Sequence, residues 1–184
     1  MASINVIKTH IDGLIVIEPQ VFGDDRGYFM ETYNQEAFAD AGLHMIFVQD
    51  NQSKSRKGVL RGLHLQTRFP QGKLVRVISG SVYDVGVDLR RGSPTYGQYA
   101  GVILSGENKK MFYVPEGFAH GFVVLSDDAV FTYKCTELYH PEVEAGIIYN
   151  DPDIGIDWPL DGIEVLLSEK DKNLPTLKQS GYAI

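Results

Sequence analysis

The sequence is divided into short segments in which apolar and polar residues alternate, and turns rich in glycine separate these segments. The clearest pair flanks the turn at residues 79–81. In the segment from Val82 to Leu89, Tyr83 and Val85 would lie on one face of a strand, and Asp84 on the other. The same reasoning predicts further strands at residues 13–19, 28–33, 45–51, 58–66, 74–78, 98–104, 110–114, 121–125, 130–139 and 145–149.

Helical signals are sparse. Residues 34–42 offer an N-cap asparagine, good helix formers and a closing glycine, and Ser168–Asp171 resembles the first turn of a short helix. The 184 residues contain no repeat or linker, so we expect a single domain over residues 1–184. Many short strands and a few short helices predict an all-β sandwich or barrel. Polar residues on the strand faces favour a jelly roll around a polar cavity.

Composition excludes several classes of protein. No run approaches the roughly 18 apolar residues that a membrane span needs. The N-terminus lacks the basic and apolar regions of a secretory signal, and a single cysteine, Cys135, suits a reducing compartment. The net charge is −7, and the basic run Lys54–Lys57 is expected to be a solvated loop too short to bind nucleic acid. We therefore expect a cytoplasmic protein with neither a membrane nor a nucleic acid as partner.

Two segments resemble the paired motifs of the cupin superfamily. The first begins at Gly58, includes His64 and ends at Gly80, and the second is Pro115–His120. Metal-binding cupins have a second histidine where this chain has Gln66, and a glutamate near the position of Lys73. A lysine ammonium has no lone pair and repels a divalent ion. We therefore expect neither a metal nor another cofactor, and Lys73 could itself stabilise a developing oxyanion.

His64 is the candidate base, because imidazole titrates near neutral pH. The alternative is a packed histidine that hydrogen-bonds the backbone. Arg61 is three residues away, so a regular strand would send the two side chains to opposite faces. They reach one pocket only if the strand is bulged or bent, and Gly62 is the expected place. Asp84 could be a partner of His64 or of Lys73.

The sequence resembles the dTDP-4-dehydrorhamnose 3,5-epimerase family over nearly its whole length. The resemblance rests on eight blocks in the right order: residues 27–31, 49–53, 58–64, 71–76, 115–122, 150–153, Ser168–Asp171 and 174–177. Several such blocks together are far more specific than one short motif. The resemblance implies a metal-free homodimer with a jelly-roll cupin fold. Its substrate would be a dTDP-4-keto-6-deoxyhexose inverted at C3 and C5.

The resemblance also implies roles for individual residues. The catalytic set would be the base His64, its orienting carboxylate Asp171, the acid Tyr133 and the cation Lys73. From the residues alone, Tyr133 could equally be a core aromatic and Asp171 a helix-capping acid. The implied substrate-binding residues are Arg26, Phe29, Glu31, Gln49, Asp50, Asn51, Arg61, His120, Tyr139, Glu144 and Lys170. Among these, Arg26, Phe29 and Glu31 would reach the partner's site, and Tyr139 is a candidate for stacking on thymine.

Three other functions stay open at this point. An epimerase that acts only at C3 or only at C5 would use the same base and acid. A metal-dependent cupin would contain stoichiometric metal. A non-catalytic sugar-nucleotide binder would need the arginines, but it gives no reason for a base, an acid and a cation to occur together.

Overall fold

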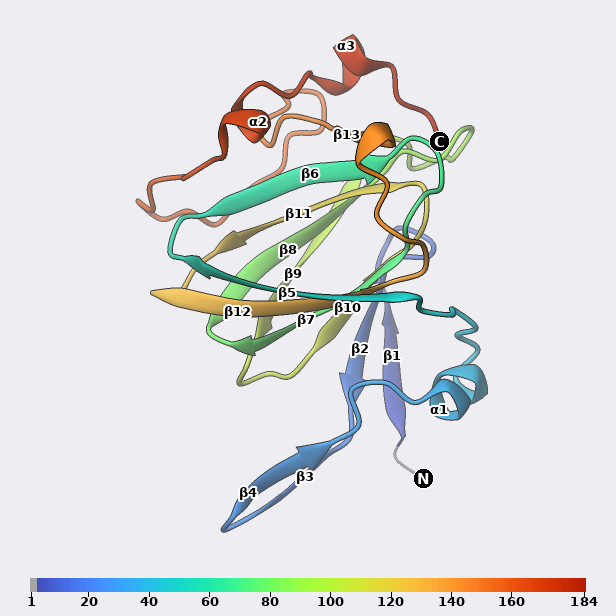
Figure 1. Ribbon diagram of the computed structural model, residues 1–184, viewed down its shortest axis with the longest axis vertical. Coiled ribbons are helices and arrows are strands. Elements are labelled where there is room, and N and C mark those ends of the chain that lie inside the picture. Colours follow the sequence, from blue (N-terminus) through green and yellow to red (C-terminus); the bar gives the residue numbers. More distant parts are fainter. Residues whose placement is uncertain (1–2) are drawn as a thin grey trace.

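The computed structural model describes residues 3–184, and strands dominate it (Figure 1). The first strands are β1 (Ile4–Lys8), β2 (Ile15–Pro19), β3 (Val21–Asp24), β4 (Gly27–Met30), β5 (Gln49–Arg56), β6 (Leu60–Gln66) and β7 (Lys73–Ser79). The others are β8 (Ser81–Asp88), β9 (Tyr99–Ser105), β10 (Met111–Val114), β11 (Phe118–Val124), β12 (Asp128–Cys135) and β13 (Glu144–Gly146). The helices are short: α1 (Gln35–Asp40), the 3-10 turn η1 (Pro141–Val143), α2 (Glu169–Lys172) and α3 (Leu177–Ser180).

Two antiparallel sheets face each other. One has six strands in the order β1-β2-β10-β7-β12-β5, and the other has five in the order β13-β6-β11-β8-β9. Most neighbours within a sheet are distant in sequence, as in a sandwich with crossed connections. The predicted all-β class with a few short helices is confirmed.

Apolar side chains fill the space between the sheets and cover two outer faces. Between the sheets lie Val75 and Phe112 from the six-stranded sheet and Leu104 from the five-stranded sheet, all fully buried. The outer face of the five-stranded sheet packs against the C-terminal part of the chain, including Trp158 and Leu177. In Figure 1 this part, with α2 and α3, lies over β6. The C-terminal segment is thereby able to place a side chain next to a strand of the sandwich.

The hairpin of β3 and β4 extends away from both sheets (Figure 1). Its aromatic side chains are exposed, with Phe22 at 48% and Phe29 at 65%. Apolar side chains left in water at this level on a projecting hairpin are a common feature of interaction surfaces.

Several predicted boundaries were wrong. The apolar run at residues 45–48 is not a strand; the strand β5 begins at Gln49 and continues through the basic run that was expected to be a loop. β5 pairs with β12 along its whole length, from Gln49 opposite Cys135 to Arg56 opposite Asp128. This long-range pairing outweighs the weak local strand preference of a polar segment. β1, β3 and α3 were not predicted, and no helix of residues 3–184 has the length and hydropathy to cross a membrane.

Candidate active site

A cavity of about 200 Å³ lies between the two sheets. Its walls contain three of the residues that the sequence singled out as catalytic, His64, Lys73 and Tyr133. They come from β6, β7 and β12, so each sheet contributes to the same hollow. The full lining is Asn51, Gln52, Ser53, Arg61, His64, Lys73, His120, Phe122, Phe131 and Tyr133.

A shift in strand register brings Arg61 and His64 into this cavity together. On β11, His120 lies opposite His64, and Phe122 lies opposite Arg61. Two residues of β6 but only one residue of β11 therefore lie between these two pairs. Gly62, in the shifted stretch, has φ +115°, and a Cβ there would lie 2.6 Å from the carbonyl oxygen of His120. The expected bend at Gly62 is confirmed, and glycine is required there by both conformation and space.

His64 is held by a carboxylate from the C-terminal segment. Its Nε2 donates to Asp171 Oδ1 at 2.6 Å, and the Asp171 side chain is almost fully buried. A carboxylate at Nε2 favours the tautomer with the proton on that nitrogen and leaves the lone pair on Nδ1. The pKa of Asp171 is raised by burial, but the hydrogen bond and charge of His64 outweigh this, so the net pKa lies below its ordinary value. Ser168 is the N-cap of α2, since its Oγ accepts the backbone N–H of Asp171 at 3.1 Å.

A second histidine–carboxylate pair lies beside the first. His120 is the cross-strand neighbour of His64, and its Nε2 contacts both carboxylate oxygens of Asp84, at 2.9 and 3.0 Å. Asp84 is fully buried. Burial raises the pKa of Asp84, against the opposing effects of His120 and Lys73. The sequence suggested Asp84 as a partner of Lys73 or His64; its hydrogen-bonding partner is His120.

Lys73 presents a cation that is poorly solvated. Burial lowers the pKa of Lys73, while nearby Cys135, Asp84 and Glu144 act in the opposite direction. Within residues 3–184, Lys73 forms no ion pair at 4.0 Å or less, so its ammonium is available to a group in the cavity. A partly desolvated ammonium is well suited to stabilise an oxyanion.

Tyr133 faces the cavity with an aromatic neighbourhood on one side. Its ring lies 5.9 Å from Phe131, which stacks on Phe122 at 4.2 Å. Burial is the main cause that raises the pKa of Tyr133. Its phenol therefore stays protonated at neutral pH and can donate a proton.

Polar residues that the sequence predicted as substrate-binding form a hydrogen-bonded group near this cavity. The Tyr139 hydroxyl donates to Glu144 Oε2 at 2.6 Å, and Lys170 Nζ lies 2.5 Å from the same oxygen. The bond to Glu144 raises the pKa of Tyr139 to about 12. Gln49 accepts the Tyr139 backbone N–H at 2.9 Å and donates to Asn51 Oδ1 at 3.1 Å. This group therefore links β5, β13 and α2.

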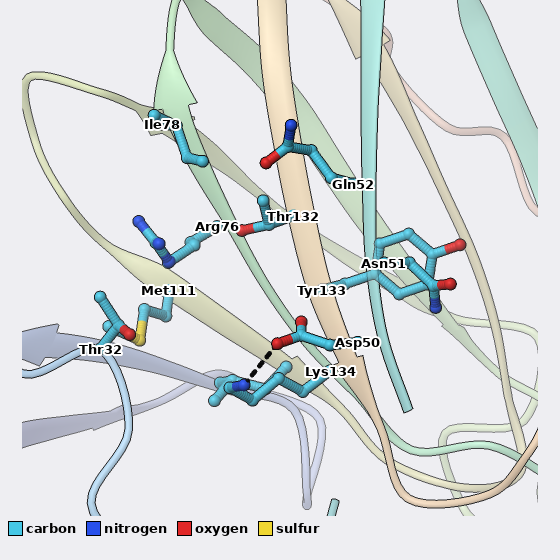
Figure 2. A pocket seen from close by; sticks show the side chains of 11 residues that line it. Thr32, Asp50, Asn51, Gln52, Arg76, Ile78, Met111, Thr132, Tyr133 and Lys134 are labelled. Carbon is cyan, nitrogen blue, oxygen red and sulfur yellow. Dashed lines mark hydrogen bonds and ion pairs between the residues drawn. The ribbon is translucent and has the colours of Figure 1, made fainter. Parts of the chain in front are cut away.

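Four of the predicted binding residues lie elsewhere. Arg26 pairs with Asp24 at the tip of the hairpin, Phe29 is exposed on β4, and Glu31 follows β4. Asp50 pairs with Lys134 at 2.8 Å, in a neighbouring hollow of about 320 Å³ that Arg76 also lines. Figure 2 shows Asp50 and Lys134 on one side of β5 and β12, and Asn51 and Tyr133 on the other. Strand alternation thus keeps the Asp50 side chain out of the cavity that holds His64.

The donor set does not fit a cupin metal centre. Within residues 3–184, no group of three or more His, Cys, Asp or Glu side chains is arranged to hold a metal ion. Gln66 is absent from the cavity wall and instead binds backbone groups of two loops through its carboxamide. Near the position of the glutamate ligand of metal-binding cupins stands the ammonium of Lys73, which cannot coordinate a metal.

Two functional contacts were missed by the sequence reasoning. Ser55 Oγ accepts from Arg61 Nε and Nη2, at 3.2 and 3.0 Å, and so orients the guanidinium. Strand alternation from Asn51 to Ser55 could have indicated that Ser55 faces the same side. The contacts of Gln66 with loop backbone had no signal in the sequence.

The chain resembles known proteins over nearly its full length. Residues 8–179 match the family described as dTDP-4-dehydrorhamnose 3,5-epimerase. The protein of that name from Methanothermobacter thermautotrophicus is 58% identical, covering 98% of each chain, and the one from Pseudomonas aeruginosa is 60% identical, covering 88% of this chain and 90% of the other. The crystal structure of dTDP-6-deoxy-D-glucose-3,5-epimerase from Legionella pneumophila, in complex with dTDP-4-keto-L-rhamnose, superposes with a TM-score of 0.92 at 56% identity, covering 95% of this chain and 93% of the other. The expected fold and family resemblance are confirmed.

Proposed function

The chain belongs to the dTDP-4-dehydrorhamnose 3,5-epimerase family, and we propose that it converts dTDP-4-dehydro-6-deoxy-D-glucose to dTDP-4-dehydro-L-rhamnose. It is an isomerase that inverts the carbons on either side of the C4 ketone. The observation that carries the mechanism is the shared cavity of His64, Lys73 and Tyr133, which holds a base, a cation and a proton donor together.

In this mechanism His64 removes the proton from C3 and from C5. Nε2 is engaged by Asp171, so Nδ1 is the atom that accepts the proton. The Asp171 carboxylate keeps the ring oriented and stabilises the imidazolium that forms. The second pair, His120 with Asp84, contributes a polar contact to the sugar.

Lys73 stabilises the enolate. A C–H bond next to a ketone is a weak acid, and a gap of about ten pKa units to imidazole would cost roughly 14 kcal/mol. The charge of the enolate resides on the C4 oxygen, where an ammonium in a partly dry cavity supplies several kcal/mol of the stabilisation. Fixed placement of the base against the C–H bond removes the entropy of encounter.

Inversion requires reprotonation from the opposite face of the ring, and Tyr133 is the donor in this proposal. Tyr133 is on the six-stranded sheet and His64 on the five-stranded sheet, so the two groups approach the cavity from different walls. The raised pKa of Tyr133, caused chiefly by burial, keeps the proton on the phenol until the carbanion forms.

The nucleotide diphosphate would bind near the cavity mouth. Arg61 and Lys170 provide cations for the pyrophosphate, and arginine is suited to bidentate phosphate contact. Tyr139, whose side chain is half exposed, stacks on thymine, while Gln49, Asn51 and Glu144 provide polar contacts. These cations allow a chain of net charge −7 to bind an anionic ligand.

We further propose a homodimer in which the β3–β4 hairpin of one subunit completes the site of the other. The supporting observation is the hairpin itself, which projects from the sandwich with Phe29 exposed and Arg26 at 89% side-chain exposure (Figure 1). Arg26, Phe29 and Glu31 would then reach the nucleotide in the partner's site. The proposal also includes a single domain over residues 1–184. It places the protein in the cytoplasm and assigns the reaction no metal or other cofactor.

Proton NMR of the reaction in heavy water tests this function. The expected product carries deuterium at both C3 and C5, and His64→Ala, as the matched control, incorporates none. One label would identify a single-centre epimerase, and absence of turnover with tight dTDP binding would identify a non-catalytic binder. Full activity in protein stripped of metal by a chelator is expected; loss that stoichiometric Fe, Zn or Mn restores would contradict the metal-free reaction.

A further inference from the structure

Gln66 occupies an unusual position at the end of β6. Its side chain is buried, with 4% exposure, and it follows His64 on the same strand face. Yet its carboxamide turns away from the cavity lining and bonds three backbone groups of two different loops. The mechanism above assigns no role to this residue.

Two of the three contacts of Gln66 flank Tyr139. The Nε2 group donates to the carbonyl of Leu138 at 3.2 Å, and Oε1 accepts from the backbone N–H of His140 at 2.7 Å. The residue between these two is Tyr139, so one carboxamide holds the backbone on both sides of it. The remaining backbone donor, the N–H of Tyr139 itself, bonds Gln49 Oε1 at 2.9 Å.

The third contact ties this segment to the loop after β6. Gln66 Nε2 also donates to the carbonyl of Phe69 at 2.6 Å. Phe69 has φ +53°, a left-handed conformation that a residue with a large side chain rarely adopts without support. Its ring lies 4.7 Å from that of His140, so the two loops touch through side chains as well as through Gln66.

Only a carboxamide satisfies all three groups. Two carbonyls need two N–H donors, and one N–H needs an acceptor. A glutamate would offer no donor, and a neutral histidine would offer one donor and one acceptor, so each would leave a backbone group without its partner. The pattern also fixes which end of the amide is oxygen, because only the oxygen can accept from His140.

We infer that Gln66 is a positioning residue for nucleotide binding, which acts by holding Tyr139 against the bound base. This rests on the proposed function, in which Tyr139 stacks on thymine. The Tyr139 hydroxyl is anchored separately by Glu144, which lies directly opposite Gln66 in the pairing of β13 with β6. With its backbone and its hydroxyl both held, the half-exposed ring of Tyr139 has one orientation and loses little freedom when a base stacks on it.

A double-mutant cycle on dTDP affinity tests this inference in the full-length protein. Gln66→Met keeps the length of the side chain and removes all three bonds, and we expect dTDP to bind about tenfold more weakly. In the Tyr139→Leu background the same change should have almost no further effect, because the ring that Gln66 positions is absent. KM for the substrate should rise in parallel, while kcat changes little. If Gln66→Met folds poorly, Gln66→Glu is the second variant, because it keeps the acceptor for the His140 N–H and removes both donors. We expect it to weaken dTDP binding as well.

Gln71→Met is the matched control. Gln71 Nε2 donates to the carbonyl of Glu137 at 2.9 Å, so it is also an amide that holds backbone in the same loop, but it does not flank Tyr139. Its loss should leave dTDP affinity within about twofold of the parent. Equal losses for Gln71→Met and Gln66→Met, or additive losses for Gln66→Met and Tyr139→Leu, would overturn the positioning role and leave the proposed function intact. Unchanged dTDP affinity in Tyr139→Leu would instead remove thymine stacking by Tyr139 from the proposed function, and the role of Gln66 with it.

Discussion

His64 and Asp171 are separated by 107 positions in the sequence, and their side chains meet at 2.6 Å between Nε2 and Oδ1. The carboxylate arrives on α2, a helix of four residues in the segment that covers the five-stranded sheet. The site is therefore completed by a part of the chain outside the sandwich. A carboxylate held this way orients the imidazole of His64 and, in the proposed mechanism, would stabilise its protonated form.

Asp171→Asn should separate the orientation of His64 from the charge that supports it. The amide can keep a hydrogen bond to the ring, but it cannot stabilise an imidazolium, so kcat is expected to fall about 10²- to 10⁴-fold with dTDP affinity retained. Steady-state kinetics and dTDP titration measure the two effects. Glu169→Gln on the same helix, where the side chain is 83% exposed, is the control and should behave as the parent. A parent-like kcat in Asp171→Asn would limit Asp171 to a structural role in the first turn of α2.

Much of this site could be predicted from the sequence, because local spacing determines which side chains share a strand face. His64 and His120 belong to the two paired motifs and lie on the neighbouring strands β6 and β11, while Lys73 lies on β7 of the other sheet. The role of Tyr133 was predicted from the family resemblance, since the residues alone left a core aromatic equally open. The bend at Gly62 was predicted because Arg61 and His64 are three residues apart, and a regular strand could not place both side chains in one pocket. Features that depend on pairing between distant segments were missed. The polar segment β5 is one example, because it forms a strand only through its pairing with β12. The carboxamide of Gln66 was missed for the same reason, since its partners lie in loops that no local pattern places.

Lys73→Met should abolish turnover and leave the fold at least as stable as the parent. Burial lowers the pKa of Lys73, which means that the folded state disfavours the charged lysine relative to the unfolded chain. At a pH below the pKa of Lys73 in the folded state, the buried ammonium lowers the free energy of unfolding. This free energy rises as the pH increases from the folded-state pKa to the higher pKa of the unfolded chain. An uncharged side chain of similar length removes this cost, so Tm at pH 7 should be equal or higher, while loss of oxyanion stabilisation lowers kcat by at least 10³-fold.

Activity of the parent enzyme should also decline at alkaline pH as Lys73 loses its proton, at a lower pH than for a free lysine. Thermal unfolding and kcat–pH profiles check both statements. The exposed Lys54→Met serves as control, with parent-like turnover. A clear fall in Tm for Lys73→Met would mean that the attraction of Asp84 and Glu144 exceeds the cost of burial.

Tyr133→Phe should leave proton abstraction intact and stop inversion. The phenyl ring preserves the packing against Phe131, and His64 still removes the proton, but no donor faces the opposite side of the sugar. Recovered substrate in heavy water should therefore gain deuterium at unchanged configuration, while product formation falls by about 10²-fold or more. NMR of substrate and product distinguishes the two events. Tyr83→Phe, in which the ring packs against Trp158 away from the cavity, should invert both centres normally. Inversion at the parent rate in Tyr133→Phe would make Tyr133 a core aromatic.

Asp88→Asn should destabilise the fold without touching the chemistry. The Asp88 carboxylate is fully buried and accepts hydrogen bonds from Arg90 Nε and Nη2, from the Arg90 backbone and from the hydroxyls of Ser93 and Thr95. Burial by itself would raise the pKa of Asp88, but the bonds from Arg90, Ser93 and Thr95 dominate and hold it far below its usual range. Arg90 is 32% exposed, so the cost is that of disturbing the hydrogen bonds of one buried carboxylate, about 1–3 kcal/mol in the free energy of unfolding.

The pH dependence of this loss follows from the sign of the shift in Asp88. A carboxylate with a depressed folded pKa contributes its full stability above the unfolded pKa of about 3.9, and the contribution is lost as pH falls towards the folded pKa. The difference between parent and Asp88→Asn in urea unfolding should therefore be constant from pH 5 to pH 7 and should shrink below about pH 4. Asp128→Asn, which breaks the half-exposed pair with Lys54, should cost at most about 1 kcal/mol at any of these pH values. A difference for Asp88→Asn that persists undiminished at the lowest pH would show that shape or amide geometry, and not the charge, holds this turn in place.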